Sequence, residues 1–321
     1  MTTSGPANAL LAIEIGGTKL QLVAGTEQGD ILDRQRLFID PDLDADDIRV
    51  LLRNGLQAWK DSYIWRAAGV GYGGPVDHRT GVICRSFHVS GWTDFPLADW
   101  LQNELRVPIV VENDSNVAAL AEAILGAGRE SDPVFYTNSG SGVGGGLIVD
   151  QRIYHGLTPG EVEFGHLRLD RSGRTIEDAC SGWAVDAKIR CLAELKPDSF
   201  LGNLQQVHAI EKGKGGEAQL LSRAIQNGDP DAIRVLEETA QDLAFGLSHV
   251  VHLFHPERII LGGGLSLLGE PWREAVARAL PPLIMEGFAP GPPVVMSELG
   301  EDVVPRGALL LAATKTRARG V

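Results

Sequence analysis

The chain has few cysteines, few aromatic residues, no excess of basic residues and no long apolar run. Its three cysteines, Cys84, Cys180 and Cys191, are odd in number and show no CxxC spacing, which argues against a disulfide framework and a cysteine zinc site. No stretch approaches the roughly 20 apolar residues of a membrane-spanning helix, and MTTSGPANAL lacks the basic start and apolar core of a signal peptide. We therefore expect a cytoplasmic protein with no membrane partner.

The charge balance is acidic. Among 321 residues, 42 Asp and Glu outnumber 29 Lys and Arg, which gives a net charge of -13. Nucleic-acid and anionic-membrane surfaces normally need a basic patch, and the chain offers only the short basic tail TKTRARG. We expect no nucleic-acid partner. The length and the 44% hydrophobic fraction are ordinary for a globular protein with two well-filled domains.

What the chain does have is a pattern of strands and helices that occurs twice. Residues 10–15, 19–25 and 31–38 read as an antiparallel meander around the turn GGTK, and residues 133–156 repeat it. Further strands are expected near 67–72, 81–85, 107–112 and 258–264, and helices near 44–60, after Pro96, 113–128, 177–190, 216–227, 230–254, after Pro271 and 306–317. We expect a duplicated α/β unit with a central cleft, divided into a smaller domain (1–116 plus 302–321) and a larger domain (117–301).

Two glycine-rich turns stand at equivalent places in the two half-chains. A glycine turn lets backbone N–H groups approach a bound phosphate because no Cβ intervenes. Alone, EIGGTK fits an ordinary hairpin equally well. The second turn, NSGSGVGGG at 138–146, contains five glycines and two serines, more than a hairpin needs. Together the turns predict a polyphosphate-binding cleft in which Thr18, Ser139 and Ser141 offer hydroxyls.

A polar run follows the apolar strand expected at 107–112. Asp114 stands where this strand ends and a helix begins. An aspartate there can serve simply as a helix cap. The run ENDSN, however, places five polar residues after five apolar ones, and ligands bind at the carboxyl ends of strands in doubly wound sheets. We therefore favour a functional role for Asp114.

The segment EVEFGHLRLD offers two polar groups three residues apart. Glu163 supplies a carboxylate and His166 an imidazole, and both suit the hydroxyls of a polyol. The pair is a poor metal site because no further His or Cys lies at ligand spacing.

Eight motifs in order resemble the ROK family of bacterial sugar kinases and repressors, from residue 11 to about residue 313. They are EIGGTK, GYGGPVD, GWTDFPL, VVENDSNVAALAE, SGSGVGGGLI, EFGH, IEDACSG and ILGGGLS. The family belongs to the actin, hexokinase and Hsp70 group, so the resemblance implies a two-domain actin-like (ribonuclease H-like) ATPase fold and a homodimer. It also implies an ATP- and Mg²⁺-dependent kinase for a small-molecule sugar, first of all for the 6-hydroxyl of glucose. The alternatives are fructose, mannose, N-acetylglucosamine and N-acetylmannosamine.

The resemblance also implies roles for matching residues. Asp114 would be the general base. The sugar ligands would be Gly73, Gly74, Asn113, Glu163, His166 and Glu177. The phosphates of ATP would be held by Gly16, Gly17, Thr18, Lys19, Ser139, Gly140, Ser141 and Gly142, and its adenosine would lie beside Gly262, Gly263 and Gly264.

The loop after EFGH departs from the family. Many ROK members carry a cysteine-rich zinc motif of the form CxCGxxGCxE there, whereas this chain reads RLDRSGRTIE at 168–177 without a cysteine. We expect no zinc site. Support for the loop is expected instead from ion pairs of Arg168, Asp170, Arg171 and Arg174.

Three single positions also depart from the family. Gly73 stands where proline is common and His88 where asparagine is frequent, so the identity of the sugar is in doubt. Glu14 replaces the usual aspartate that helps to hold Mg²⁺. Glutamate keeps the charge and adds about 1.5 Å of reach. A bridging water can absorb that difference, so we expect Glu14 still to serve the metal.

Other functions within the family stay open. A ROK repressor carries a helix-turn-helix domain before the glycine turn, whereas about ten residues precede the first strand here, so a repressor is not expected. A catalytically weak sugar sensor would accommodate Glu14, although a sensor has no need of a base such as Asp114. The phosphoryl donor is open between ATP and polyphosphate.

Overall fold

The computed structural model describes residues 5–17, 19–38, 43–86, 89–160, 162–208 and 216–317. The chain divides into two compact units. Unit 1 comprises Met1–Leu125, Gln151–Val162 and Glu301–Val321, and unit 2 comprises Gly126–Asp150 and Glu163–Gly300. Unit 1 therefore extends beyond the expected boundary at residue 116, because helix α3 (Asp114–Leu125) packs along α10 (Val303–Arg317).

Unit 1 is built on a five-stranded sheet in the order β3-β2-β1-β4-β7. The strands are β1 (Ala7–Ile15), β2 (Lys19–Gly25), β3 (Ile31–Phe38), β4 (Tyr63–Tyr72) and β7 (Ile109–Asn113). The first three form the expected antiparallel meander, and β4 and β7 continue the sheet parallel to β1. A separate small hairpin joins β5 (Val76–Asp77) and β6 (Val82–Ile83).

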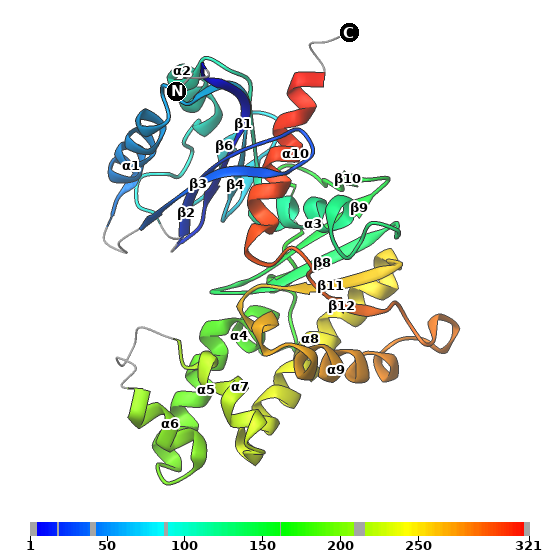
Figure 1. Cartoon of the computed structure of the whole chain (residues 1–321). Helices are drawn as coiled ribbons and strands as arrows, with labels where there is room; N and C mark the ends of the chain where they lie inside the picture. The colour runs from blue at the N-terminus through cyan, green and yellow to red at the C-terminus, as the bar shows by residue number, and fades with distance from the viewer. Residues whose placement is uncertain are drawn as a thin grey trace. The chain divides into compact units, whose positions relative to one another are not determined.

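Helices cover both faces of this sheet. Helices α1 (Ala45–Ala58) and α2 (Leu97–Leu105) contact one face, and α3 and α10 contact the other (Figure 1). A strand buried on both faces needs apolar residues without alternation, and β1 is accordingly buried from Ala9 to Ile15. Leu11, Leu22 and Trp92, each 0% exposed, belong to its core. The continuous apolar run at residues 10–15 is thus explained by the burial of both faces of β1.

The second sheet has the order β10-β9-β8-β11-β12, and unit 2 contains all of its strands except β10. The strands are β8 (Val134–Ser139), β9 (Val143–Val149), β10 (Arg152–Ile153), β11 (Arg258–Gly262) and β12 (Val294–Met296). Strands β8 and β9 are antiparallel, while β11 runs parallel to both β8 and β12. The expected second meander is present, and β12 is a strand that we did not expect. By contact, β10 groups with unit 1.

The helices of unit 2 lie along and beyond this sheet (Figure 1). They are α4 (Ile176–Cys180), α5 (Gly182–Leu195), α6 (Phe200–His208), α7 (Ala218–Gln226), α8 (Pro230–Phe254) and α9 (Glu270–Ala279). The short 3-10 turns are η1 (Phe164–His166), η2 (Gly264–Leu268), η3 (Pro281–Leu283) and η4 (Glu286–Phe288), and η5 (Gly300–Asp302) precedes α10. The helix expected at 177–190 is two helices, because Ser181 is extended and caps the second.

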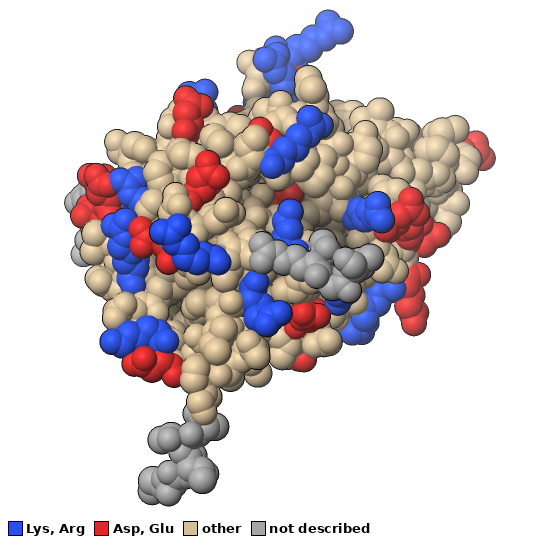
Figure 2. All heavy atoms as spheres, turned by 90° about the horizontal axis from the view of Figure 1, so that it is seen from above, with Lys and Arg blue, Asp and Glu red and all other residues tan. Residues whose placement is uncertain are grey.

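Charged side chains of both signs are interspersed on the face seen in Figure 2. Charged side chains of the described residues also form ion pairs, such as Arg53 with Glu104 and Arg36 with Glu301. Interspersed charges give no strong single-sign field on this face. Within the described residues, no helix is both long enough and apolar enough to cross a membrane.

Candidate functional site

Predicted residues of unit 1 follow the ends of three parallel strands. The register pairs Ile15 of β1 with Tyr72 of β4, and Tyr72 with Asn113 of β7. The next residue along each strand is a predicted site residue: Gly16, Gly73 and Asp114. Main-chain pairing therefore brings together three groups that lie far apart in the sequence, at the sheet edge where ligands bind in such folds.

Gly73 lies close to both of its neighbours. Its N–H donates to the carbonyl of Ile15 at 2.8 Å. A Cβ at this position would lie 3.3 Å from Asp114 Oδ2 and 3.4 Å from Gly16 Cα. A side chain here would crowd both the carboxylate and the glycine turn, so glycine keeps this space open.

Asn113, rather than Asp114, caps helix α3. Its Oδ1 accepts hydrogen bonds from the N–H groups of Ser115 at 2.9 Å and Asn116 at 3.2 Å. Its Nδ2 donates to the carbonyl of Gly74 at 3.3 Å, and the residue is 8% exposed. The amide expected to bind sugar is therefore largely engaged in ordering the strand–helix junction. Asp114 is the first residue of the helix, where backbone N–H groups favour a negative charge.

The glycine turn of unit 1 is closed by a hydrogen bond from Gly16 N to the Lys19 carbonyl, at 2.7 Å. Gly17 lies within this turn, whereas Thr18 and His88 fall outside the described residues. The turn therefore retains its expected tight geometry at the residues that can be described.

Glu14 lies one residue before the end of β1, paired in register with Gln21. Gln21 Nε2 donates to its Oε2, and Lys19 Nζ lies 3.5 Å from its Oε1. Glu14 is 9% exposed, and this burial raises the pKa of its carboxyl despite the opposing effects of Lys19 and Gln21. In the described parts of the chain, no cluster of three or more His, Cys, Asp or Glu could hold a metal. One carboxylate still fits Mg²⁺, which keeps several waters.

A buried hydrogen bond beside Asp114 escaped the sequence reasoning. The Glu112 side chain is 4% exposed, and His155 Nε2 lies 2.6 Å from its Oε2. The His155 ring stacks on His78, with centroids 3.7 Å apart. Glu112 belongs to the polar run that drew attention to Asp114, but nothing in the sequence pointed to either histidine.

Unit 2 repeats the strand-end arrangement. The register pairs Asn138 of β8 with Gly262 of β11, so the next residues are Ser139 and Gly263. Gly263 has φ of 78°, and a Cβ there would lie 2.6 Å from Ser139 N, so only glycine fits. Ser139 is 3% exposed, whereas Ser141 is exposed. Of the two hydroxyls expected on this turn, only that of Ser141 is on the surface of the unit.

The predicted sugar ligands of unit 2 lie in one region. Glu163 directly precedes the 3-10 turn η1, and His166 is its last residue. Both side chains are half-exposed or more, with His166 Nε2 3.8 Å from Glu163 Oε2. Burial raises the pKa of the Glu163 carboxyl, His166 opposes the rise, and the charge of Glu177 adds to it. Glu177 also holds the second glycine turn, since its Oε2 accepts from Val143 N at 2.9 Å.

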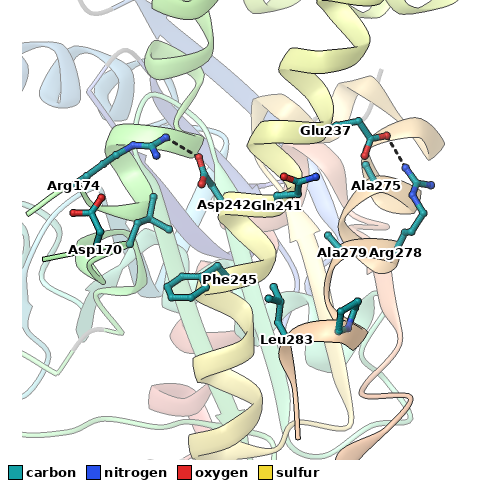
Figure 3. A pocket seen from close by; sticks show the side chains of 12 residues that line it. Asp170, Arg174, Glu237, Gln241, Asp242, Phe245, Ala275, Arg278, Ala279 and Leu283 are labelled. Carbon is teal, nitrogen blue, oxygen red and sulfur yellow. Dashed lines mark hydrogen bonds and ion pairs between the residues drawn. The ribbon is translucent and has the colours of Figure 1, made fainter. Parts of the chain in front are cut away.

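The loop between these ligands is a hairpin. Leu169 N donates to the carbonyl of Arg174 at 2.8 Å, and Arg168 bridges to Thr175 through the backbone. The expected ion-pair support is confirmed for Arg174, whose guanidinium lies 2.7 Å from the carboxylate of Asp242 on α8 (Figure 3). Asp170 instead accepts from the backbone N–H of Ser172 at 2.7 Å, within the hairpin turn.

A pocket of about 570 Å³ opens beside the hairpin, between α8 and α9 (Figure 3). Its walls carry two ion pairs: Arg174 with Asp242, and Arg278 with Glu237 at 2.6 Å. It is lined by Leu169, Asp170, Arg174, Glu237, Gln241, Asp242, Phe245, Ala275, Arg278, Ala279, Pro282 and Leu283. None of these is a predicted base, sugar ligand or nucleotide ligand. One wall of the pocket is formed by the hairpin that carries Arg174.

Similarity to known proteins extends over nearly the whole chain. The ROK family model matches residues 10–315. A glucokinase of Halalkalibacterium halodurans is 27% identical over 308 residues, which cover 91% of either chain. The crystal structure of a ROK family glucokinase from Streptomyces griseus, in complex with glucose and AMPPNP, superposes with a TM-score of 0.83 at 28% identity, covering 95% of this chain and 99% of that one.

The same fold also serves regulators. A ROK family transcriptional regulator, a homologue of the E. coli MLC protein, superposes with a TM-score of 0.82 at 20% identity, covering 97% of this chain and 79% of that one. At that identity the likeness shows the fold alone. The fold is the two-domain α/β fold of the actin-like ATPases, as expected from the motifs. From the family model, the relatives and the solved structures together, the chain belongs to the ROK family.

Proposed function

We propose that this protein is an ATP- and Mg²⁺-dependent hexose kinase that phosphorylates the 6-hydroxyl of glucose, with Asp114 as general base. Its relatives include glucokinases at 27% and 28% identity, which supports a sugar kinase. The observation that carries the proposal is the row Ile15–Tyr72–Asn113. It sets a carboxylate beside a glycine turn, and base and phosphate turn are the two parts that phosphoryl transfer to an alcohol requires.

In this mechanism Asp114 accepts the proton of the sugar 6-hydroxyl as O6 bonds to the γ-phosphorus. The bond between that phosphorus and the bridging oxygen breaks, and ADP leaves. Base catalysis of this kind contributes on the order of 10²- to 10⁴-fold. The rest of the acceleration comes from positioning and from charge stabilisation.

The two glycine turns would bind the nucleotide, and Glu14 would bind the metal. Backbone N–H groups of Gly17 and Lys19 in unit 1, and of Ser141 and Gly142 in unit 2, would hold phosphates. Gly16 and Gly140 would line the same turns, because their own N–H groups donate to the carbonyls of Lys19 and Gly142. A Cβ at Gly140 would meet no atom within 4 Å, so this turn leaves room for a ligand. Mg²⁺, when bound, neutralises charge on the transferred phosphoryl group. Gly262 to Gly264 would lie beside the adenosine.

Glu163, His166 and Glu177 would hold the sugar hydroxyls. Their oxygens and ring nitrogens can accept or donate hydrogen bonds, and their mutual electrostatic effects support a common ligand. Gly73, Gly74 and Asn113 would complete the sugar side. Asn113 would contribute little directly, because its amide is engaged in the cap of α3.

Release of ADP on incubation with ATP, Mg²⁺ and single sugars tests the proposal. Glucose is expected to give the highest kcat/KM, and 6-deoxyglucose, which lacks the reacting hydroxyl, is expected to give none. Turnover with fructose, mannose, N-acetylglucosamine or N-acetylmannosamine above glucose would move the substrate assignment within the same class. No turnover with any sugar, with either ATP or polyphosphate as donor, would contradict the kinase.

A sugar sensor of the same family is the second candidate. It is favoured by Glu14, whose carboxylate is engaged by Gln21 and Lys19. A sensor would bind glucose in a calorimeter without releasing ADP. The expected homodimer and cytoplasmic location stay predictions, and sedimentation equilibrium tests the first.

A further inference from the structure

The carboxylate of Glu112 lies at the centre of the junction that presents Asp114. Its Oε1 accepts from the backbone N–H of Asn113 at 2.9 Å and from Nδ2 of Asn116 at 3.1 Å. These partners precede and follow Asp114 in the chain. Residues on both sides of Asp114 therefore donate to one buried carboxylate. The roles proposed above do not include this carboxylate.

His155 supplies the remaining contact of this carboxylate. Its Nε2 lies 2.6 Å from Glu112 Oε2, and because a carboxylate accepts, we assign the proton to Nε2. A buried carboxylate needs hydrogen-bond donors to offset its lost hydration, and removal of one donor is costly. His155 comes from residues 151–162, a segment otherwise distant in sequence from the strand–helix junction.

A second histidine holds the first in place. The His78 ring stacks on His155 with an interplanar angle of 12°. Its Nδ1 is buried with no hydrogen-bond partner among the described residues. Burial, followed by the charge of His155, lowers the pKa of His78, while Glu112 and Asp77 oppose this and Arg79 adds to it. The His78 ring packs against one face of the His155 ring, whose Nε2 lies toward Glu112.

We propose that His155 is a positioning residue for the base: its hydrogen bond to Glu112 fixes the junction that orients Asp114. This inference rests on the proposed role of Asp114. Loss of the bond leaves a buried negative charge two residues from Asp114 and loosens the junction. Among the proposed sugar ligands, Glu163, His166 and Glu177 make none of these contacts, and Asn113 makes one only through its backbone N–H while its side chain caps α3. We therefore expect kcat to change more than the sugar KM.

Two matched substitutions test the bond. Glutamine places its Nε2 near the position of the histidine Nε2, whereas asparagine is one carbon too short to reach Glu112, and both are polar. His155→Asn is expected to lower kcat on the order of 10- to 100-fold, as displacement of a reacting group does. The acid limb of its kcat profile is expected to move to higher pH. His155→Gln is expected to restore most of kcat and the original limb.

A double variant separates charge from position. In His155→Asn with Glu112→Gln the uncompensated charge is absent, so the acid limb is expected to return while kcat stays low. An unchanged kcat and acid limb in folded His155→Asn would overturn the inference, and so would a His155→Gln enzyme as impaired as the asparagine variant. Should either variant fail to fold, Glu112→Gln alone decides: a kcat profile identical to the wild type in both limbs and height would also overturn it.

Asp114→Asn, measured in parallel, keeps the two proposals apart. If it abolishes turnover while His155→Asn matches the wild type, only the inference about His155 fails. If Asp114→Asn retains turnover, the proposed base itself is wrong.

Discussion

The two five-stranded sheets share a strand order, but the two units present their polar groups differently. In unit 1, Glu14 and Glu112 are 9% and 3% exposed and are held within or beside parallel strands. In unit 2, the side chains of Glu163 and His166 are 51% and 62% exposed, and these residues lie just before and at the end of a 3-10 turn. One set is fixed by main-chain register, whereas the other lies at an exposed turn.

This difference predicts how substitutions divide between the kinetic constants. Groups held by register have one geometry before substrate arrives, so their loss changes the chemical step. Groups on an exposed turn are ordered partly by the ligand, so their loss changes binding. Under the proposed function, unit 1 changes are expected in kcat and unit 2 changes in the sugar KM.

The largest effect is expected from Asp114→Asn. The amide cannot accept the hydroxyl proton, so kcat should fall by about 10²- to 10⁴-fold. Glucose binding measured by calorimetry should persist. Asp99→Asn, the same isosteric change at an exposed residue of α2, is the control and should retain kcat. If the affinity for glucose fell by a factor comparable to the fall in kcat, the proposed difference between the two units would be wrong.

Glu163→Gln is expected to act next most strongly, and on KM. Loss of a charge-assisted hydrogen bond should raise the glucose KM by about 10- to 100-fold, with a smaller change in kcat. In the wild type, burial raises the pKa of Glu163, so the glucose KM should rise as the pH falls through that pKa and the carboxylate is protonated. The glutamine variant should lack this limb. A limb that persists in the variant would assign it to another group.

Glu14→Gln is expected to raise the stability of the folded protein and to weaken its binding of Mg²⁺. Burial raises the folded-state pKa of Glu14, so its ionised form opposes folding at neutral pH. The variant should therefore show a higher Tm at pH 7, with a shift on the order of 2–4 °C for each kcal/mol gained. The gain should vanish as the pH falls through that raised pKa, where wild-type Glu14 is neutral.

The same variant should need more Mg²⁺ for half-maximal activity, because a neutral amide attracts the cation less. Glu14→Asp keeps the charge and serves as the matched control. If glutamine and aspartate give the same Mg²⁺ dependence as the wild type, Glu14 does not serve the metal.

Arg174→Ala is expected to have the smallest effect. Its ion pair with Asp242 joins side chains that are 44% and 25% exposed, so it should contribute only about 0.2–1 kcal/mol. Hairpin mobility should raise the glucose KM by no more than about fivefold at unchanged kcat. Arg278→Ala breaks the other ion pair of the same pocket and should leave KM unchanged. Equal effects of the two variants would mean that the hairpin tether has no special role.

The sequence sufficed for features that depend on local pattern. The two meanders, the glycine turns and the position of Asp114 after a buried strand all follow from periodicity and turn chemistry. The sequence analysis predicted neither the short strand β12 nor helix α6. Strand β12 lacks a local signal because it is only three residues long and pairs with a strand far away in the sequence. Its apolar residues alone do not distinguish it from a loop.

Site details that require tertiary contacts could not be predicted. The sequence analysis considered Asp114 as the cap of α3, whereas the structure assigns the cap to Asn113. The sequence analysis expected the hydroxyl of Ser139 to be available to a phosphate. Ser139 instead ends a buried strand beside Gly263 and is 3% exposed. The bond between Glu112 and His155 joins residues 43 positions apart, and no spacing rule connects them.

The row Ile15–Tyr72–Asn113 has a consequence for how this protein tolerates mutation. Because backbone pairing sets the row, volume-conserving exchanges among the apolar residues of β1, β4 and β7 should leave Gly16, Gly73 and Asp114 where they are. An insertion or deletion of one residue within β4 or β7 would instead turn the following side chains to the opposite face. In a random library, therefore, many core substitutions should be silent, whereas single-codon indels in these strands should abolish the proposed kinase activity.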